Sequence, residues 1–448
     1  MVISSASPNK SPKIIVLDDD PTGSQTVHSC LLLLKWDVET LKLGLEDASP
    51  IFFVLTNTRS LTPQAAATVT AEVCTNLKVA LAETNTTNYL LVSRSDSTLR
   101  GHYPIETDAI EQYLGPFDAH FLTPHFFEAG RVTVDSTHYI ELNGVRTPTH
   151  DTEFAQDSVF GYSTSYLPDY VAEKTQEKIS AEQVERFLLK EIREGCLSRL
   201  MSLKGNCCVA VDGEQQSDLD KFAQDLTTAA AQGKKFLFRS AASLLTALAN
   251  LPPQPTSPAE MEQITRSSHG AVLVGSHVTK TTRQLQQLLK VPDVVGIEID
   301  VARLKDSSEF MHQTLLKDTL DQIPTLHAQG HTPIIYTSRE ELTFDDATTR
   351  LLFGEAVSAL LVDIVKGLPG DLGFLISKGG ITSNDTLSKG LSLTSTRLLG
   401  QVIPGVSVVT TEADHPQFPN LPVVLFPGNV GDDDALAIAY QRLTTSED

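Results

Sequence analysis

Three adjacent aspartates, Asp18, Asp19 and Asp20, follow an apolar run near the start of the chain and open a turn that continues Pro-Thr-Gly-Ser. Ligands of open α/β sheets gather at the carboxyl ends of the strands. Neighbouring carboxylates repel one another, so such a group is costly unless it is exposed, bound to Mg²⁺ or facing a hydroxyl. We interpret Asp19 and Asp20 as candidate catalytic residues that orient or deprotonate an acceptor hydroxyl. An exposed turn with an aspartate cap is the alternative.

Arginines and hydroxyl groups gather in a second segment, Arg94-Ser95-Asp96-Ser97-Thr98-Leu99-Arg100-Gly101, which also follows an apolar run. A guanidinium holds a carboxylate through two hydrogen bonds, while Ser, Thr and Asp side chains bind hydroxyls. Such a set suits a polyhydroxy acid, although a salt-bridged surface turn would look similar. The candidate substrate-binding residues are Asp20, Arg59, Arg94, Asp96, Ser97, Thr98 and Arg100.

The second half of the chain carries glycine-bearing turns after three other apolar runs. Glycine lets the backbone approach a ligand, and a helix that starts there offers free N–H groups to phosphate. None of the turns is a Walker A loop, and no G-x-G-x-x-G fingerprint follows an early strand, so each could be an ordinary strand-to-helix turn. The candidate nucleotide-binding residues are Ser276, Gly379, Gly380, Ile381, Thr382, Gly428 and Asn429.

The last of these turns leads into Asp432-Asp433-Asp434. Aspartates suit the start of a helix because its dipole favours negative charge there. Asp434 is a weak candidate for metal binding, and no ligand set is predicted. In the preceding turn, Thr382 with Asp385 resembles a capping box.

These segments need rigid elements to position them, and the chain alternates short apolar runs with longer amphipathic ones. That pattern predicts an α/β protein with mainly parallel sheets flanked by helices. A stretch with four prolines, 251–265, divides the chain into expected domains 1–255 and 256–448, with the active site in the cleft between them. The expected strands are 13–18, 51–56, 89–93, 206–211, 234–238, 270–275, 294–299, 332–337, 373–377 and 422–426, and the expected helices are 62–84, 180–194, 217–232, 279–290, 308–329, 345–367 and 433–442.

Composition limits the class of protein. The 448 residues carry a formal net charge of −21, so the chain's own field disfavours nucleic acid and anionic membranes as partners. Five cysteines without a C-x-x-C pair indicate reduced thiols, and neither a signal peptide nor a membrane-spanning run is evident. We therefore expect a cytoplasmic protein with a small-molecule ligand. The oligomeric state is not predicted.

In order along nearly the whole chain, the sequence resembles the four-carbon acid sugar kinase family. The matching segments are Asp19-Asp20-x-Thr22-Gly23, Thr58-Arg59-Ser60, 96–101, 124–131 with its final Glu128-Ala129-Gly130-Arg131, His138-Tyr139, 152–157, Gly275-Ser276, Gly379-Gly380-x-Thr382 and Gly428-Asn429-x-Gly431-x-x-Asp434. Four positions depart from the family's usual pattern, namely Pro21, Arg94, Ile381 and Phe426.

The resemblance implies an N-terminal domain that binds a sugar acid and a C-terminal domain that binds ATP, with Mg²⁺ as in kinases generally. The acid would meet an aspartate of the first turn, Arg59 and the Asp96–Thr98 segment, and ATP would meet Ser276, the Gly379–Thr382 turn and Gly428. A threonate, erythronate or 3-oxo-tetronate would be phosphorylated at its terminal hydroxyl. The alternatives are a non-catalytic sensor of sugar acid or nucleotide and a Rossmann-type oxidoreductase.

Overall fold

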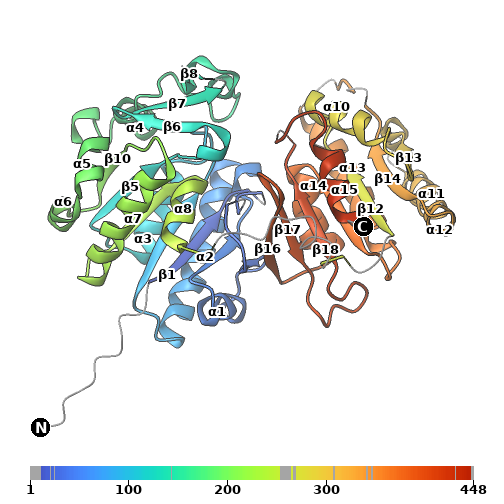
Figure 1. Cartoon of the computed structure of the whole chain (residues 1–448), viewed down its shortest axis with the longest axis horizontal. Coiled ribbons are helices and arrows are strands. Elements are labelled where there is room, and N and C mark those ends of the chain that lie inside the picture. Colours follow the sequence, from blue (N-terminus) through green and yellow to red (C-terminus); the bar gives the residue numbers. More distant parts are fainter. Residues whose placement is uncertain are drawn as a thin grey trace, which may run out of the picture. The chain divides into compact units, whose positions relative to one another are not determined.

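The computed structural model describes residues 12–444 except 21, 25, 143, 253–263, 266–268, 306–307, 340–341, 345–346 and 429. Its contacts divide the chain into two compact units, Met1–Pro252 and Pro253–Asp448. Figure 1 shows the first unit in blue to green and the second in yellow to red. The boundary expected between residues 255 and 256 lies outside the described residues.

The first unit is built on a parallel sheet in the strand order β2-β3-β1-β4-β11-β5-β10-β9. All neighbouring strands in this series pair in parallel, so their carboxyl ends lie along one edge. The strands are β1 (Lys13–Asp18), β2 (Cys30–Leu33), β3 (Ile51–Leu55), β4 (Tyr89–Arg94), β5 (Ala119–Thr123), β9 (Glu185–Phe187), β10 (Cys207–Val211) and β11 (Phe236–Ser240).

Helices cover both faces of this sheet because its central strands are buried on both sides. Ile15, Phe52 and Leu91 share one core with side chains of α1, α2 and α3, and on the other face Phe121 packs on Phe222 of α7. The helix α2 begins where Thr62 accepts a hydrogen bond from the backbone N–H of Ala65, with a proline at its first position. The helices are α1 (Val38–Glu46), α2 (Pro63–Glu83), α3 (Ile105–Leu114), α4 (Leu167–Thr175), α5 (Leu189–Glu194), α6 (Leu197–Ser202), α7 (Gln216–Ala231) and α8 (Ala242–Ala249).

A small antiparallel sheet, β6-β7-β8, is inserted after β5 (Figure 1). It consists of β6 (Arg131–Val134), β7 (Thr137–Leu142) and β8 (Val145–Pro148). The sequence analysis does not predict these strands, because they are short and their side chains are largely half-exposed.

The strands of the second unit lie in the order β13-β14-β12-β15-β18-β17-β16. The strands from β13 to β18 in this order are parallel, while β17 is antiparallel to both of its neighbours. β12, β15 and β18 are therefore adjacent, and their carboxyl ends meet. The strands are β12 (Gly270–Val274), β13 (Val294–Ile299), β14 (Thr332–Thr337), β15 (Phe374–Lys378), β16 (Ser395–Ile403), β17 (Val406–Thr410) and β18 (Pro422–Phe426).

The helices α10 and α15 pack on the core of this second sheet through Leu285, Leu288 and Leu436. On another side, α13 contacts α11 and α14. The helices are α10 (Thr279–Leu288), α11 (Glu309–Leu320), α12 (Ile323–Ala328), α13 (Ala347–Lys366), α14 (Gly380–Asp385) and α15 (Ala435–Thr444), and a π-helical turn at Thr386–Gly390 continues α14.

The predicted α/β class with two mainly parallel sheets is confirmed, but three local predictions are wrong. The expected helix 180–194 is a 3₁₀ turn, the strand β9 and the short α5. The expected helix 308–329 is interrupted before α12, whose first turn holds Pro324, because proline lacks the N–H that would continue a helix. Gly379, rather than Thr382, precedes α14, so the capping box does not form. Among the described helices, none is long and apolar enough to cross a membrane.

Candidate active site

The acidic turn and the arginine-rich segment meet at one edge of the first sheet. β1 lies between β3 and β4, and Asp18 stands opposite both Leu55 and Arg94 in the strand registers. The turns that leave these strands are therefore adjacent. Parallel neighbouring strands thus bring together Asp19, Arg59 and the 94–101 segment as the sequence pattern predicts.

Asp19 is enclosed by hydrogen-bond donors. Arg59 donates to both of its carboxylate oxygens, at 2.5 Å from Nη2 and 3.3 Å from Nε, and the Ser95 hydroxyl donates at 2.6 Å. Only 1% of Asp19 is exposed. A carboxylate with so little free surface is well suited to holding Arg59 in place, and it offers little room for a substrate hydroxyl.

Asp20 is the more accessible of the two predicted catalytic residues. Arg59 Nη1 donates to its Oδ2 at 2.8 Å, and the Thr22 backbone N–H and hydroxyl both donate to its Oδ1. Burial raises the pKa of Asp20, but Arg59, Arg94 and the Thr22 hydrogen bonds together bring the pKa below its ordinary value. This partly exposed carboxylate therefore stays ionised and can accept a hydrogen bond from a hydroxyl.

The pKa of Asp18 is shifted in the opposite direction from that of Asp20. Burial raises its pKa to about 7, although Arg94 opposes this, and Asp19 and Asp20 add to the rise. Arg94 Nη1 lies 3.5 Å from Asp18 Oδ1, and the other oxygen has no hydrogen-bond partner among the described residues. Asp18 and Arg94 thus form a buried pair behind the exposed part of the turn.

The 96–101 segment is held by hydrogen bonds within itself and by contacts with other segments. Asp96 accepts hydrogen bonds from Thr98 and from Arg100 Nε, the latter at 2.7 Å. Burial raises the pKa of Asp96, but Arg59 and Arg100 outweigh it and hold the pKa well below its usual range. Arg100 also lies 5.0 Å from the ring centre of Phe154.

Three backbone carbonyls of the same segment are fixed by buried side chains. His138 Nε2 lies 2.8 Å from the Ser97 carbonyl, and the hydroxyls of Tyr162 and Tyr170 donate to the carbonyls of Thr98 and Leu99, both at 2.8 Å. Leu99 has a φ of 68°, a left-handed conformation that non-glycine residues rarely adopt. The Tyr170 bond therefore supports a strained residue at the centre of the segment.

Sequence reasoning missed a buried ion pair that supports this edge. Arg239 Nη1 donates to Glu106 Oε2 at 2.6 Å and to the Ser93 hydroxyl at 2.8 Å. Its Nη2 donates to the Ser95 hydroxyl at 2.7 Å, which in turn donates to Asp19. Arg239 lies in an apolar run with no neighbouring motif, so only the proximity of β11 to β4 reveals its role.

The candidate substrate-binding residues also do not include Arg131, although it ends the Glu-Ala-Gly-Arg motif. Its Nη1 donates to the Ala129 carbonyl, and no described carboxylate lies within ion-pair distance of it. Burial lowers the pKa of Arg131, and Asp96 and Arg100 are close enough to act on it electrostatically. Asp96 and Glu153 favour its charged form, but Arg131 forms no ion pair with a described carboxylate, in contrast to Arg59, Arg94 and Arg100.

In the second unit, the glycine turns after β12, β15 and β18 are in contact with one another. A Cβ added to Gly275 would overlap the Thr382 side chain, and one added to Gly379 would lie 3.1 Å from the Ser276 Cβ. A Cβ on Gly428 would lie 3.3 Å from the Ser276 hydroxyl. The predicted residues of these turns therefore form one compact group, apart from Asn429, which lies outside the described residues.

Two neighbouring positions of the turn after β15 face open space. A Cβ on Gly380 would meet no described atom within 4 Å, and the Ile381 side chain is 65% exposed. Gly379 has a φ of 126°, which favours glycine. The turn thus leaves room beside its backbone for a ligand.

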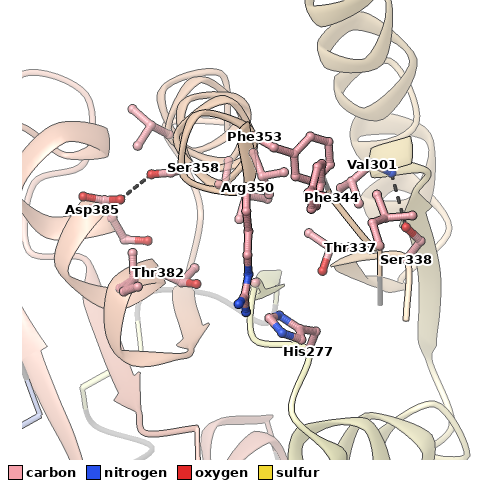
Figure 2. Close-up of a pocket in the computed structure, with 18 residues that line it drawn as sticks. His277, Val301, Thr337, Ser338, Phe344, Arg350, Phe353, Ser358, Thr382 and Asp385 are labelled. Carbon is pink, nitrogen blue, oxygen red and sulfur yellow. Dashed lines mark hydrogen bonds between the residues drawn. The ribbon is translucent and has the colours of Figure 1, made fainter. Parts of the chain in front are cut away.

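A cavity of about 260 Å³ continues from these turns. Gly275 and Thr382 line it at one end, and Phe344 and Phe353, with ring centres 5.0 Å apart, form part of its apolar wall. Figure 2 shows the Arg350 side chain extending from α13 toward His277, and both residues line the cavity. An apolar recess beside glycine turns has the features of a site for a base and its attached phosphates.

The metal prediction finds little support in the chemistry of the side chains. No group of three or more His, Cys, Asp or Glu residues with metal-binding geometry occurs in the described part of the chain. Asp434 is exposed at the start of α15. Because Mg²⁺ in kinases is usually held by one or two carboxylates together with the phosphates of the nucleotide, Asp434 stays a weak candidate for metal binding.

Two domain models match the chain in sequence order. A sugar-binding N-terminal domain matches residues 14–248, and a nucleotide-binding C-terminal domain matches residues 271–436. The first match includes the acidic turn and the 94–101 segment, and the second includes all three glycine turns.

The chain is also similar to three individual proteins over nearly its full length. A D-erythronate kinase of Heliobacterium modesticaldum is 23% identical, with 96% of this chain and 97% of the relative aligned. A solved structure from Salmonella typhimurium LT2, described as a candidate tRNA synthase, has a TM-score of 0.66 at 19% identity, covering 95% of this chain and 98% of the other. Protein HI1011 of Haemophilus influenzae has a TM-score of 0.60 at 17% identity, covering 96% and 100%. The two solved structures share the fold, and the paired domain matches show that the chain belongs to the four-carbon acid sugar kinase family.

Proposed function

We propose that this protein is an ATP-dependent kinase that phosphorylates the terminal hydroxyl of a four-carbon sugar acid, such as threonate, erythronate or a 3-oxo-tetronate. The observation that carries the proposal is the continuity between cavity and turns in the second unit, where Gly275 and Thr382 belong to both. A nucleotide base in the cavity would extend its phosphates along Ser276, Gly379, Gly380 and Gly428. The likeness to a D-erythronate kinase supports the choice of acceptor.

On the acceptor side, the ionised and partly exposed Asp20 would orient the hydroxyl. Phosphoryl transfer depends mainly on positioning and charge stabilisation, so a carboxylate that orients its partner is useful even when it is a weak base. Asp19 would act through Arg59, which it holds by two hydrogen bonds. An Asp20→Asn variant that keeps a near-normal kcat would refute this role.

The carboxylate of the acid would bind among the arginines of the same edge. Arg131 is the strongest candidate for binding this carboxylate, because the other three arginines already form ion pairs with aspartates. Transfer also requires acid and nucleotide to meet, and we propose that they do so in a cleft between the two units.

The test is a coupled ADP-release screen of the full chain with D- and L-threonate, D- and L-erythronate and the 3-oxo acids, with and without Mg²⁺. ADP release with one of these acids is the expected result. Calorimetry on the same samples separates the alternatives: binding of acid and nucleotide without ADP release would favour a sensor, and binding of NAD would favour an oxidoreductase.

A further inference from the structure

Lys378 is a buried lysine at the meeting point of the three glycine turns, and none of the roles described above uses its side chain. It is the last residue of β15, and its carbonyl accepts hydrogen bonds from the backbone N–H groups of Gly275 and Ser276. It has no exposed surface. Its ammonium donates to the Pro427 carbonyl and lies 4.2 Å from the ring centre of Phe426, the residue opposite it on β18.

The charge of this ammonium is not neutralised within the described part of the chain. No described carboxylate pairs with it, and the charged group that acts on it is Lys280 of α10, which has the same sign. The other neighbours, Gly275, Ser276 and Phe426, do not titrate, and Asp385 of α14 is already paired with Lys389. Burial, reinforced by Lys280, lowers the pKa of Lys378 to about 7.

A buried ammonium without a counter-charge is destabilising, and one hydrogen bond to a carbonyl does not offset the loss of hydration. If the lysine served only to fill the space beside Phe426, an apolar side chain would do so at lower cost. The position therefore indicates an anion other than the carboxylates of the described residues. The adjoining turns, with Ser276 and Gly428 in contact, are the place where such an anion would bind.

We propose that Lys378 supplies the positive charge that binds the phosphates of the nucleotide at the three turns, an inference that rests on the function proposed above. Because the side chain has no exposed surface, its ammonium must leave the Pro427 carbonyl to touch a phosphate oxygen. Rotation about the terminal bonds of the lysine side chain achieves this, and the neutral acceptor is exchanged for a charged one, which makes a stronger hydrogen bond.

This exchange couples nucleotide binding to the uptake of a proton by the Lys378 amine. At pH 8 the buried amine is mostly neutral in the free protein, while the phosphate-bound form is an ammonium, so binding takes up as much as one proton. Below pH 7 the amine is already charged and the uptake disappears. The affinity for nucleotide should therefore fall as the pH rises from 7 to 9, as far as this group is concerned.

The experiment is calorimetry of ADP binding to the full chain at pH 8 in two buffers with different heats of ionisation. Lys378→Met removes the charge at similar volume, and Lys290→Met, an exposed lysine just after α10, is the matched control. We expect proton uptake in the wild type and the control but not in Lys378→Met. We also expect the Kd for ADP to rise about ten- to hundredfold in Lys378→Met alone.

Two results would overturn the inference while leaving the proposed function intact. One is a Lys378→Met variant that binds ADP with the wild-type Kd and proton uptake. The other is a wild type that binds ADP at pH 8 without proton uptake. This second measurement does not depend on whether a variant folds. A wild type that binds no ADP at all refutes the proposed function, and the inference falls with it.

Discussion

The Arg239–Glu106 ion pair allows a sharp test of what stabilises the edge of the first sheet that carries the candidate substrate-binding residues. Its side chains are 9% and 6% exposed, and the two charged atoms lie 2.6 Å apart. Arg239→Met leaves the Glu106 carboxylate buried with Thr58 as its remaining described donor, at 2.6 Å. Removing one partner of a buried pair costs about 3–5 kcal/mol, and the surviving Thr58 bond places the loss at ~3 kcal/mol.

Glu106→Gln should cost about 2–3 kcal/mol, since Arg239 keeps its bonds to Ser93 and Ser95 but loses its counter-charge. The double variant removes both charges, so its loss should be about 1–2 kcal/mol, the scale of the lost hydrogen bonds. The double variant should thus be more stable than the Arg239→Met single variant. Such strong non-additivity is the signature of a coupled pair.

Urea unfolding followed by tryptophan fluorescence measures this cycle in the full chain, because Trp36, the one tryptophan, lies in the first unit and packs on its core. Urea is preferred to guanidinium because it does not screen charges. If the losses of the two single variants simply add in the double variant, the pair is not coupled and the account of this edge is wrong.

Three further predictions concern the two ligand-binding regions. Gly380→Val should fold normally, because its side chain meets open space, yet weaken ADP binding at least tenfold by filling that space; wild-type affinity in calorimetry would contradict this. Without nucleotide, the free energy of unfolding of the wild type should rise relative to that of Lys378→Met as the pH increases from 7 to 10, by up to ~1.4 kcal/mol per pH unit. The reason is that Lys378 keeps its proton in the unfolded chain but has lost it in the folded protein. Equal pH profiles of the two proteins in thermal unfolding would be evidence against this account. For Asp18, whose folded pKa of about 7 exceeds the ordinary 3.8, stability should fall as the pH rises from 4 to 7, and Asp18→Asn should remove that fall in Trp36-monitored unfolding.

The parallel core was predictable from the sequence because its strands are buried on both faces and read as continuous apolar runs. From that arrangement follows the adjacency of the acidic turn with Arg94, since strands that neighbour one another in a parallel sheet end at the same edge. The grouping of Ser276, Gly379 and Gly428 was predictable for the same reason. The antiparallel strands β6–β8 were not, because half-exposed short strands carry no comparable apolar signal.

Contacts between distant segments were beyond the reach of sequence patterns. Nothing local distinguishes Arg239 or Glu106 from an ordinary charged residue, and their pairing depends on β11 lying next to β4. The opposite pKa shifts of Asp18 and Asp20 likewise depend on burial and on the arginines that lie near each carboxylate. Lys378 looks from the sequence like one more polar residue of a turn, and only its burial reveals an unbalanced charge.

The hydrogen bonds from the Tyr162 and Tyr170 hydroxyls to the carbonyls of Thr98 and Leu99 have an evolutionary consequence. The 96–101 segment, which we propose as part of the sugar-acid site, is held by phenol groups that come from a different part of the chain and donate to its backbone. Under the proposed function, mutations of these two tyrosines should change the preference between stereoisomers even when all proposed substrate-binding residues stay the same. Members of the family with identical candidate substrate-binding residues are therefore not expected always to prefer the same acid.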